Sequence, residues 1–412
     1  MQPKNLLWPA AIRIFAAIAL TLAFTSSAHA ASEQVLYSFT LGSDGGEPYG
    51  NLVFDSAGNL YGTTSLGGNM KCDNGCGTVF ELTPASGGGW TQTVIHTFEG
   101  GNDGAEPVAG LAIDAAGNLY GTTAGGGNSK DLGTVFKLTH GSGGWTETVI
   151  HRFTGGKDGF APYANVILDS AGNLYGTTSG GGKNNLGIVF ELSPTAGGKW
   201  TEKILRAFPG GNGGGAPNAV IFDASGDLIG TTYRGGPAIY HESGIVYKLT
   251  KNSGGGWKET VLYSFTGGAD GMHPEAGVIL DNLGNIYGTT YDGGSSKKGV
   301  VFQLSPGSGG WTQTVLHTFT TISQGQNPRA PLLFDGSGNL YGTTAGGGVH
   351  GTVFELIPGS GGWTYNLLYN FPTSSSGSNP YGGVIFDTSG SLYGTTLNGG
   401  ASNYGTVYKV TP

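Results

Sequence analysis

The chain has 412 residues, a formal net charge of −8 and only 11% charged residues, while 81 positions are glycine. So few Lys and Arg residues, with no cluster of them, do not provide the basic surface that a phosphate backbone requires, which excludes nucleic acid as an expected partner. The glycines recur at fixed intervals between β-branched and aromatic residues. This pattern indicates turns in an ordered β protein and excludes a disordered or fibrous chain.

The N-terminus predicts a secretory signal peptide. Two basic residues precede an apolar run over residues 14–24, and Ala28-His29-Ala30 offers a small-residue cleavage site. The run is shorter than the roughly 20 residues that a membrane-spanning helix needs. We therefore expect residues 1–30 to be removed on export and residues 31–412 to form one mature domain. We expect it to be secreted, periplasmic or at the cell surface, with no transmembrane segment and no C-terminal anchor.

One segment occurs seven times in the sequence, at intervals of 52 to 59 residues. A clear copy at residues 335–344 reads Asp-Gly-Ser-Gly-Asn-Leu-Tyr-Gly-Thr-Thr, and in every copy the aspartate lies three residues before a glycine and eight before a Thr-Thr pair. A period of this length is typical of a closed or stacked array of small β units. The seven aspartates are Asp55, Asp114, Asp169, Asp223, Asp281, Asp335 and Asp387.

Each repeat predicts four short strands, which we name a to d. Strand a is an apolar run such as residues 384–386, and strand b is Asn-Leu-Tyr-Gly-Thr-Thr. Strand c is Gly-Thr-Val-Phe-Glu-Leu, as at residues 351–356, and strand d runs from Trp to Phe, as at residues 145–153. Between strands a and b, Asp-x-x-Gly predicts a tight turn, in which the carboxylate accepts N–H groups two or three residues on and glycine is left-handed. Glycine inside strand b, such as Gly62, predicts the close approach of a ring or backbone.

Seven units of four antiparallel strands predict an all-β fold, a seven-bladed β-propeller. The chain begins with a d strand at residues 35–39 and ends with a c strand at residues 405–410. We expect these two strands to pair antiparallel, so that the N-terminal strand completes the last blade. This closure explains why six repeat tryptophans serve seven blades. In the competing arrangement, residues 35–39 pair with a strand from residues 50–82.

The pattern Pro-x-x-Gly-h-h-h-Asp-x-x-Gly-Asn-Leu-Tyr, with h for an apolar residue, resembles NHL-type propeller repeats. The complete unit, with Tyr-Gly-Thr-Thr and Gly-Thr-Val-Phe-Glu-Leu, resembles the GloVer tandem repeat of exported bacterial proteins over residues 33–412. The resemblance implies a surface or secreted repeat protein, often attached through a C-terminal anchor. It provides no established catalytic residues to transfer, and a propeller fold implies no particular function.

Two kinds of connection differ in their variability. The link from the terminal Phe of strand d to the next Pro always contains eight residues with glycine sixth, which predicts a fixed structural connection whose acids form turns. The loops between strands b and c run from six to twelve residues, and binding residues concentrate on such variable loops. With strand a innermost, links and loops share one face at the mouth of the central channel, where we predict a binding site.

Repeats four and five provide the richest set of aromatic and polar residues on this face. Rings bury apolar area while hydroxyls and charges fix orientation, which suits a glycan or a protein ligand. We predict a monomeric, non-enzymatic binding or scaffold protein with no cofactor and no metal; solvated loops without a ligand are the alternative. The candidate binding residues are Tyr233, Arg234, Tyr240, His241, Glu242, His273, Glu275, Tyr291 and Asp292.

An enzyme is the second hypothesis. A lyase or hydrolase acting on a polysaccharide or a small extracellular substrate would use His241 or His273 as base, with Glu242, Glu275 or Asp292 as partner. These groups would have to come within ~3 Å of a substrate proton. The sequence contains no Gly-x-Ser-x-Gly elbow, no His-Glu-x-x-His and no phosphate-binding loop. A purely structural role in an envelope layer is the third hypothesis.

The remaining histidines and both cysteines predict structural roles. Strand d carries His96, His151 and His317 at one repeat position, where other copies have Tyr or Arg, so we expect packing with a polar tip at the surface. Cys72 and Cys76 lie in one loop and predict a local disulfide in an exported protein. A metal site is the alternative, but it would need further ligands.

Overall fold

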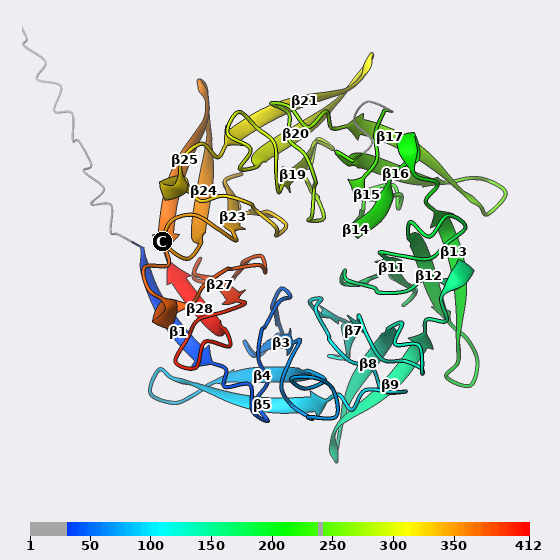
Figure 1. The fold of residues 1–412 in the computed structure, drawn as a ribbon, viewed down its shortest axis with the longest axis vertical. Coiled ribbons are helices and arrows are strands. Elements are labelled where there is room, and N and C mark those ends of the chain that lie inside the picture. The colour runs from blue at the N-terminus through cyan, green and yellow to red at the C-terminus, as the bar shows by residue number, and fades with distance from the viewer. Residues whose placement is uncertain (1–30, 238–241) are drawn as a thin grey trace, which may run out of the picture. The chain divides into compact units, whose positions relative to one another are not determined.

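The computed structural model describes residues 31–237 and 242–412. Over these residues, seven antiparallel sheets of four strands each stand radially around a central axis (Figure 1). Strand a is innermost and strand d outermost in each blade, as predicted, and the predicted seven-bladed β-propeller is confirmed. The predicted signal peptide lies outside the described residues. The described part of the chain contains no helix with the length and apolar character needed to span a bilayer.

The blades are numbered 1 to 7 in chain order. In all but blade 4, strand a has only two residues in the sheet, whereas β14 of blade 4 has eight. From strand a to strand d, the blades are β2 (Val53–Phe54), β3 (Leu60–Thr64), β4 (Thr78–Pro84), β5 (Trp90–Thr97); β6 (Ala112–Ile113), β7 (Leu119–Thr123), β8 (Thr134–Gly141), β9 (Gly144–Arg152); β10 (Ile167–Leu168), β11 (Leu174–Thr178), β12 (Ile188–Pro194), β13 (Trp200–Ala207); β14 (Gly215–Phe222), β15 (Leu228–Arg234), β16 (Ile245–Lys251), β17 (Trp257–Ser264); β18 (Ile279–Leu280), β19 (Ile286–Thr290), β20 (Val300–Gly307), β21 (Gly310–Thr318); β22 (Leu333–Phe334), β23 (Leu340–Thr344), β24 (Thr352–Gly359), β25 (Gly362–Asn370); and β26 (Ile385–Phe386), β27 (Leu392–Thr396), β28 (Thr406–Thr411), β1 (Ser32–Ser38).

Four of the links between blades contain one turn of 3-10 helix. They are η1 (Gly156–Asp158), η2 (Gly211–Gly213), η3 (Ile322–Gln324) and η4 (Ser374–Ser376).

The ring closes through the two ends of the described chain. Strand β1 pairs antiparallel with β28, from Ser32 opposite Thr411 to Ser38 opposite Thr406. Figure 1 shows the first strand beside the last one in blade 7. The predicted closure is confirmed, and the competing arrangement within residues 50–82 is wrong.

The turn between strands a and b explains the repeated aspartate. In blade 1, Oδ1 of Asp55 accepts the backbone N–H groups of Ala57 and Asn59, each at 2.8 Å. Its Oδ2 accepts the Asn59 side-chain amide at 2.9 Å and the Tyr61 hydroxyl at 3.2 Å. Gly58 has a φ of 87°, as expected for the left-handed position. The carboxylate therefore reaches N–H groups two and four residues on, where the sequence predicted two or three.

Rings from neighbouring blades form the core. The Phe that ends strand d of one blade packs against the aromatic residue of strand c in the next, as with Phe98 and Phe136, whose ring centroids lie 5.1 Å apart. The glycine inside strand b makes room for that ring, because a Cβ on Gly121 would lie 2.5 Å from Cζ of Phe136. The predicted close approach of a ring to this glycine is confirmed. Burial between blades thus joins all seven sheets in one ring.

The two residues of the Thr-Thr pair make different hydrogen bonds. The first threonine joins blades in six of the seven repeats, since its hydroxyl donates to a carbonyl in the next blade, as from Thr63 to Ala109 at 2.8 Å. The second threonine donates to the carbonyl two residues on, as from Thr123 to Gly125 at 2.8 Å, in all seven repeats. This second bond fixes the start of each b–c loop at the channel mouth.

Candidate functional site

A cavity of about 520 Å³ occupies the centre of the ring. The residue directly after the proline of each d–a link lines it, and we name these seven residues the channel ring. They differ from blade to blade: the channel ring consists of Tyr49, Val108, Tyr163, Asn218, Glu275, Arg329 and Tyr381. Deeper in the cavity, strand a contributes an apolar wall that includes Ile167, Ile221 and Ile279.

Backbone hydrogen bonds hold the links that carry the channel ring. In blade 5, His273 has a φ of 56°, donates its N–H to Ser243 at 2.9 Å and accepts the N–H of Tyr291 at 2.9 Å. The residue before proline has a positive φ in all seven links. Because these bonds use main-chain groups only, the backbone stays the same while the side chains can change. The links and the b–c loops lie on one face, bridged as Met272 is to Asp292, and we name it the mouth face.

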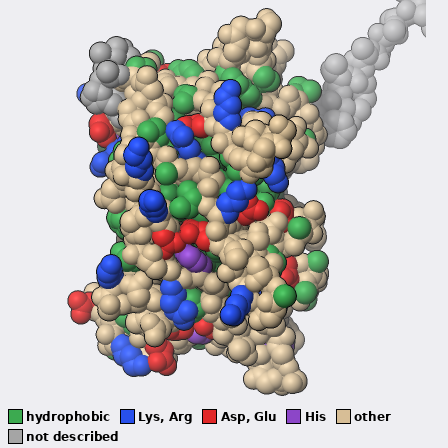
Figure 2. Space-filling model, turned by 90° about the vertical axis from the view of Figure 1, so that its right-hand side faces the viewer, with side chains coloured by type: hydrophobic (Ala, Val, Ile, Leu, Met, Phe, Trp, Pro, Cys, Tyr) green, Lys and Arg blue, Asp and Glu red, His purple; other side chains and the backbone are tan. Residues whose placement is uncertain are grey.

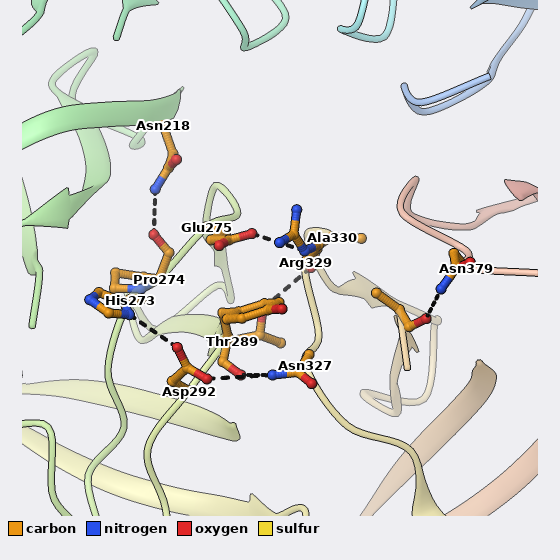
Figure 3. Close-up of polar contacts among 12 residues, drawn as sticks. Asn218, His273, Pro274, Glu275, Thr289, Asp292, Asn327, Arg329, Ala330 and Asn379 are labelled. Atoms are coloured by element: carbon orange, nitrogen blue, oxygen red, sulfur yellow. Dashed lines mark hydrogen bonds and ion pairs between the residues drawn. The ribbon is translucent and has the colours of Figure 1, made fainter. Parts of the chain in front are cut away.

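Arg329 is the centre of the polar cluster on the mouth face (Figure 3). Its Nε lies 3.2 Å from Oε2 of Glu275, and it donates from a terminal nitrogen to the Tyr49 hydroxyl at 3.3 Å. The guanidinium also lies over two rings, 4.5 Å from the centroid of Tyr291 and 4.7 Å from that of Tyr381. One cation thus connects four side chains from three blades, which leaves it with a fixed position and orientation.

Burial and the Arg329 charge set the electrostatics of this cluster. Burial raises the pKa of Glu275 even though Arg329 opposes that rise. Burial acts against the charge of Arg329, but the Glu275 carboxylate and the surrounding tyrosines together outweigh burial and raise the pKa of Arg329. Burial raises the pKa of the Tyr49 hydroxyl, so this group stays a neutral donor and acceptor at physiological pH.

A second contact joins blades 4 and 5 at the rim. The rings of Tyr233 and His273 are stacked, with centroids 4.3 Å apart and planes inclined by 8°. Nδ1 of His273 lies 3.1 Å from Oδ2 of Asp292 (Figure 3). Asn327 donates its amide to the carbonyl of Tyr291 at 3.0 Å and reaches Asp292 at 3.5 Å. Burial, with Glu275 and Asp292 adding to it, raises the pKa of Tyr233.

The predicted site residues fall into three groups. Five of them lie together at the mouth in the contacts described above: Tyr233, His273, Glu275, Tyr291 and Asp292. Arg234 and Glu242 pair with each other at 3.4 Å, both with more than half of the side chain exposed, and neither lines the cavity. Tyr240 and His241 lie outside the described residues.

The sequence-based search missed Arg329, Tyr49, Tyr163, Asn218 and Tyr381. The candidates came from the b–c loops, whose lengths vary, and from the adjoining link of blade 5, whereas the other d–a links were interpreted as structural because their length is constant. A signal was present, since the position after the invariant proline holds five different residue types in the seven copies.

The remaining predicted features have clear positions. Cys72 and Cys76 form the predicted disulfide. Four of the His and Tyr residues of strand d contact the acids of the links on the outer wall, as in the 3.0 Å contacts of His151 with Asp158 and of Tyr37 with Asp44.

A sequence model described as the Gloeobacter/Verrucomicrobia repeat matches residues 21–242 and 216–412, which together include nearly the whole chain. No protein among the curated proteins matches.

Solved structures with a similar fold include extracellular propellers. One is the extracellular domain of a protein assigned as a hybrid two-component system of B. thetaiotaomicron, with a TM-score of 0.56 and 13% identity. The match covers 92% of this chain and 39% of that protein. Another is PorZ, a surface component of the type-IX secretion system of Porphyromonas gingivalis, with a TM-score of 0.52 and 15% identity, covering 87% and 46%. This chain thus spans less than half the length of either protein. At such identities the likeness supports the fold alone.

Proposed function

We propose that this chain, which belongs to the Gloeobacter/Verrucomicrobia repeat family, is an exported, non-enzymatic propeller that binds a glycan in the mouth of its central channel. The observation that carries the proposal is the channel ring, in which seven equivalent backbone positions present different side chains around one cavity of about 520 Å³. Because main-chain bonds hold each link, these side chains are not needed to build the fold and are available to contact a ligand in the cavity.

The chemistry of the channel ring favours a glycan. Three of its residues are tyrosines, and Tyr233 adds a fourth to the cavity wall. Aromatic faces stack on sugar rings, while amides and paired charges take up the hydroxyls. Asn218 provides the amide, and Arg329 with Glu275 provides a charge pair held by neighbours. A volume of this size lies in the ~300–1,000 Å³ range of small-ligand pockets, enough for a short oligosaccharide or a chain end.

Export is part of the proposal. Its support is the sequence pattern of residues 1–30 together with the Cys72–Cys76 disulfide, since disulfides persist in oxidising compartments. Cleavage after Ala30, read from the N-terminal sequence of the mature protein, tests this part.

A glycan array followed by calorimetry on the strongest oligosaccharide tests the binding site. Tyr163 is 58% exposed and takes no part in the core, and valine occupies its equivalent position in blade 2 as Val108. Tyr163→Val should therefore fold normally and weaken binding by about 10-fold or more, as loss of an aromatic anchor does. The control is Leu283→Ala, at a residue 81% exposed in an a–b turn, on the face opposite the mouth. Absence of any glycan ligand, or equal affinity of both variants, contradicts the proposal.

A lyase or hydrolase is the second candidate because His273 and Asp292 form a hydrogen-bonded pair of 3.1 Å at the same rim. The test is His273→Asn, since asparagine occupies the equivalent positions 327 and 379 with the same positive φ. In a binding protein this variant keeps the glycan affinity within about threefold, because it leaves the channel ring unchanged although the stacking on Tyr233 and the contact with Asp292 are lost. Turnover of the bound oligosaccharide by the wild type, lost in His273→Asn, would favour the enzyme instead.

A further inference from the structure

Seven equivalent contacts join the outer strands of neighbouring blades, and we name each one a node. A node combines three residues: the residue two before the terminal Phe of strand d, the link residue before the invariant glycine, and the residue six before the terminal Phe of strand d in the next blade. In blade order, the nodes are Tyr37, Asp44 and Gln92; His96, Asp103 and Glu147; His151, Asp158 and Glu202; Arg206, Gly213 and Glu259; Tyr263, Asp270 and Gln313; His317, Gln324 and Tyr365; and Tyr369, Ser376 and Glu33.

In two of the nodes, one carboxylate is the only charged group, and neutral side chains donate the hydrogen bonds. The Tyr37 hydroxyl donates to Oδ2 of Asp44 at 3.0 Å, and the Gln92 amide donates to the Asp44 backbone carbonyl at 3.3 Å. The node of Tyr263, Asp270 and Gln313 repeats both bonds, at 2.9 and 3.2 Å. In each case a single carboxylate is surrounded by neutral donors.

The node of His151, Asp158 and Glu202 lacks one of these donors. Nε2 of His151 lies 3.0 Å from Oδ1 of Asp158, but Glu202 replaces the glutamine. A carboxylate cannot donate to the carbonyl that Gln92 and Gln313 bond in their nodes. Oε1 of Glu202 is buried and has no hydrogen-bond partner among the described residues. Two carboxyl groups therefore face each other beside one imidazole, and either a shared proton or a bound cation must offset their repulsion.

The geometry of this node suits a metal ion. One ligand atom from each of His151, Asp158 and Glu202 lies within 4.8 Å of the other two. Thr154 orients Asp158, since its backbone N–H and its hydroxyl both donate to Oδ2, the hydroxyl at 2.8 Å. Oδ1 thus points to the node. Threonine supports Asp44 and Asp270 in the same way, so this support belongs to the link and fixes the position of Asp158 before any ion binds.

We propose that His151, Asp158 and Glu202 bind a divalent transition-metal cation of the zinc type, which ties blade 2 to blade 3 at the outer wall. Imidazole with carboxylates is a donor set that favours zinc over calcium. Bonds of about 2.1 Å place ligand atoms about 3 to 3.5 Å apart, so the side chains close by about 1 Å on binding. His151 and Asp158 are 20% and 17% exposed, which lets water complete the coordination.

The surface of the outer wall shows histidine and acidic side chains close together (Figure 2). Figure 2 shows a side of the wall on which histidine lies beside acidic side chains, with basic side chains interspersed around them. The same three residue types recur in the node of His96, Asp103 and Glu147. There Nε2 of His96 is 3.6 Å from Asp103, against 3.0 Å in the His151 node. The His151 node, which has the shorter distance between histidine and aspartate, is therefore the proposed site. The His96 node is an internal control.

The test is Zn²⁺ binding by the purified, tag-free protein, measured as metal retained after dialysis and as the melting temperature in Zn²⁺ against EDTA. The main variant is His151→Tyr/Glu202→Gln, which recreates the Tyr, Asp and Gln node already present twice in this chain. It should fold normally without metal. Wild type should retain Zn²⁺ and gain about 5 °C in melting temperature at a concentration about 100-fold above Kd. The variant should lose one equivalent of Zn²⁺ and that gain.

The matched control is His96→Tyr/Glu147→Gln, which makes the same exchange one blade earlier and should keep the equivalent of Zn²⁺ bound at the His151 node. The proposal is overturned if wild type retains no Zn²⁺, if His151→Tyr/Glu202→Gln retains as much as wild type, or if Ca²⁺ binds more tightly than Zn²⁺. Loss of this Zn²⁺ from the control variant alone overturns it as well.

Discussion

The two faces of the propeller differ in how strictly equivalent positions keep the same residue from blade to blade. On the face opposite the mouth, which we name the turn face, the side chain of each repeat aspartate is used within its own turn, as Asp114 accepts four hydrogen bonds from Ala116, Asn118 and Tyr120. On the mouth face, backbone bonds hold the end of each link that carries the channel ring, and the channel-ring side chains differ. Where side chains build the turn, the residue is repeated; where the backbone builds the link, the residue is free to vary.

Blade 4 shows that the turn face keeps its charge balance even when its residues change. Ile229 replaces the tyrosine of strand b, and Asp227 replaces the asparagine, which adds a second carboxylate to the turn of Asp223. Lys248 compensates, with its ammonium 2.6 Å from Asp223 and 2.9 Å from Asp227. In blade 4, the added carboxylate of this face is thus balanced by a cation within the same blade.

The largest effect should come from opening the ring on which both faces depend. A chain that starts at residue 41 lacks β1 and Phe39, which is fully buried and packs against Phe80 of blade 1. Truncating Phe39 to alanine alone should cost about 3–5 kcal/mol of unfolding free energy, and loss of the strand should cost more. It also leaves β28 as an open edge, which promotes association.

Urea unfolding and light scattering measure both consequences. The control is a chain that starts at residue 31, which keeps β1 and should match the mature protein in urea midpoint and remain monodisperse. Equal midpoints for the chains that start at residues 31 and 41 would mean that the β1–β28 pairing does not close the ring in solution.

The difference between the two faces also explains how far the sequence could predict this molecule. Asp, the turn glycine, Thr-Thr and the terminal Phe each meet one physical need that recurs in every blade, so their repetition was enough to predict blades, turns and closure. Tyr233, His273 and Asp292 were found because they lie in the searched loop and link positions of adjacent repeats. Arg329 was missed because a link of constant length was taken to be constant in function. Its role depends on contacts with Tyr49 and Glu275, and Tyr49 is distant in sequence.

A smaller effect, confined to stability, should follow from removing one aspartate of the turn face. Asp114→Ala removes four hydrogen bonds and leaves the hydroxyl of buried Tyr120 without its carboxylate partner. We expect a loss of about 2–3 kcal/mol in unfolding free energy, measured by urea denaturation. Asp114→Asn, which keeps the oxygen that bonds the two backbone N–H groups, should lose less. Glycan affinity at the mouth should not change in either variant. A loss of affinity as large as that of Tyr163→Val would show that the faces are coupled.

The aspartates of the turn face should also make the protein acid-labile. Burial opposes their charge, but hydrogen bonds outweigh burial and lower the pKa of Asp55, Asp114, Asp169, Asp223, Asp281 and Asp387, that of Asp387 to about 2. For Asp223 the first of these bonds comes from Lys248 of strand c, and the others come from the turn. A lowered folded-state pKa means that each carboxylate stabilises the fold fully above its unfolded pKa of about 3.9 and loses that contribution as the pH falls through the folded value. The urea midpoint should therefore drop between about pH 4 and pH 2. Asp387→Asn should reduce this drop, and a midpoint that stays constant over the window would contradict the assignment.

The smallest effect on stability should come from a large change in the channel ring, Val108→Tyr. Val108 is the only aliphatic member of the ring, between Tyr49 of blade 1 and Tyr163 of blade 3, and its side chain faces a cavity of about 520 Å³ that accommodates tyrosine at three equivalent positions. The link backbone is held by main-chain bonds, such as that from the N–H of Glu106 to Cys76 at 3.0 Å, which the substitution does not touch. We therefore expect the unfolding free energy to stay within about 0.5 kcal/mol of wild type, as for surface substitutions. An added aromatic face should strengthen glycan binding, measured by calorimetry with the same oligosaccharide as for Tyr163→Val. A loss of more than about 2 kcal/mol would show that the channel ring is packed as a core, and the contrast between the two faces would fail.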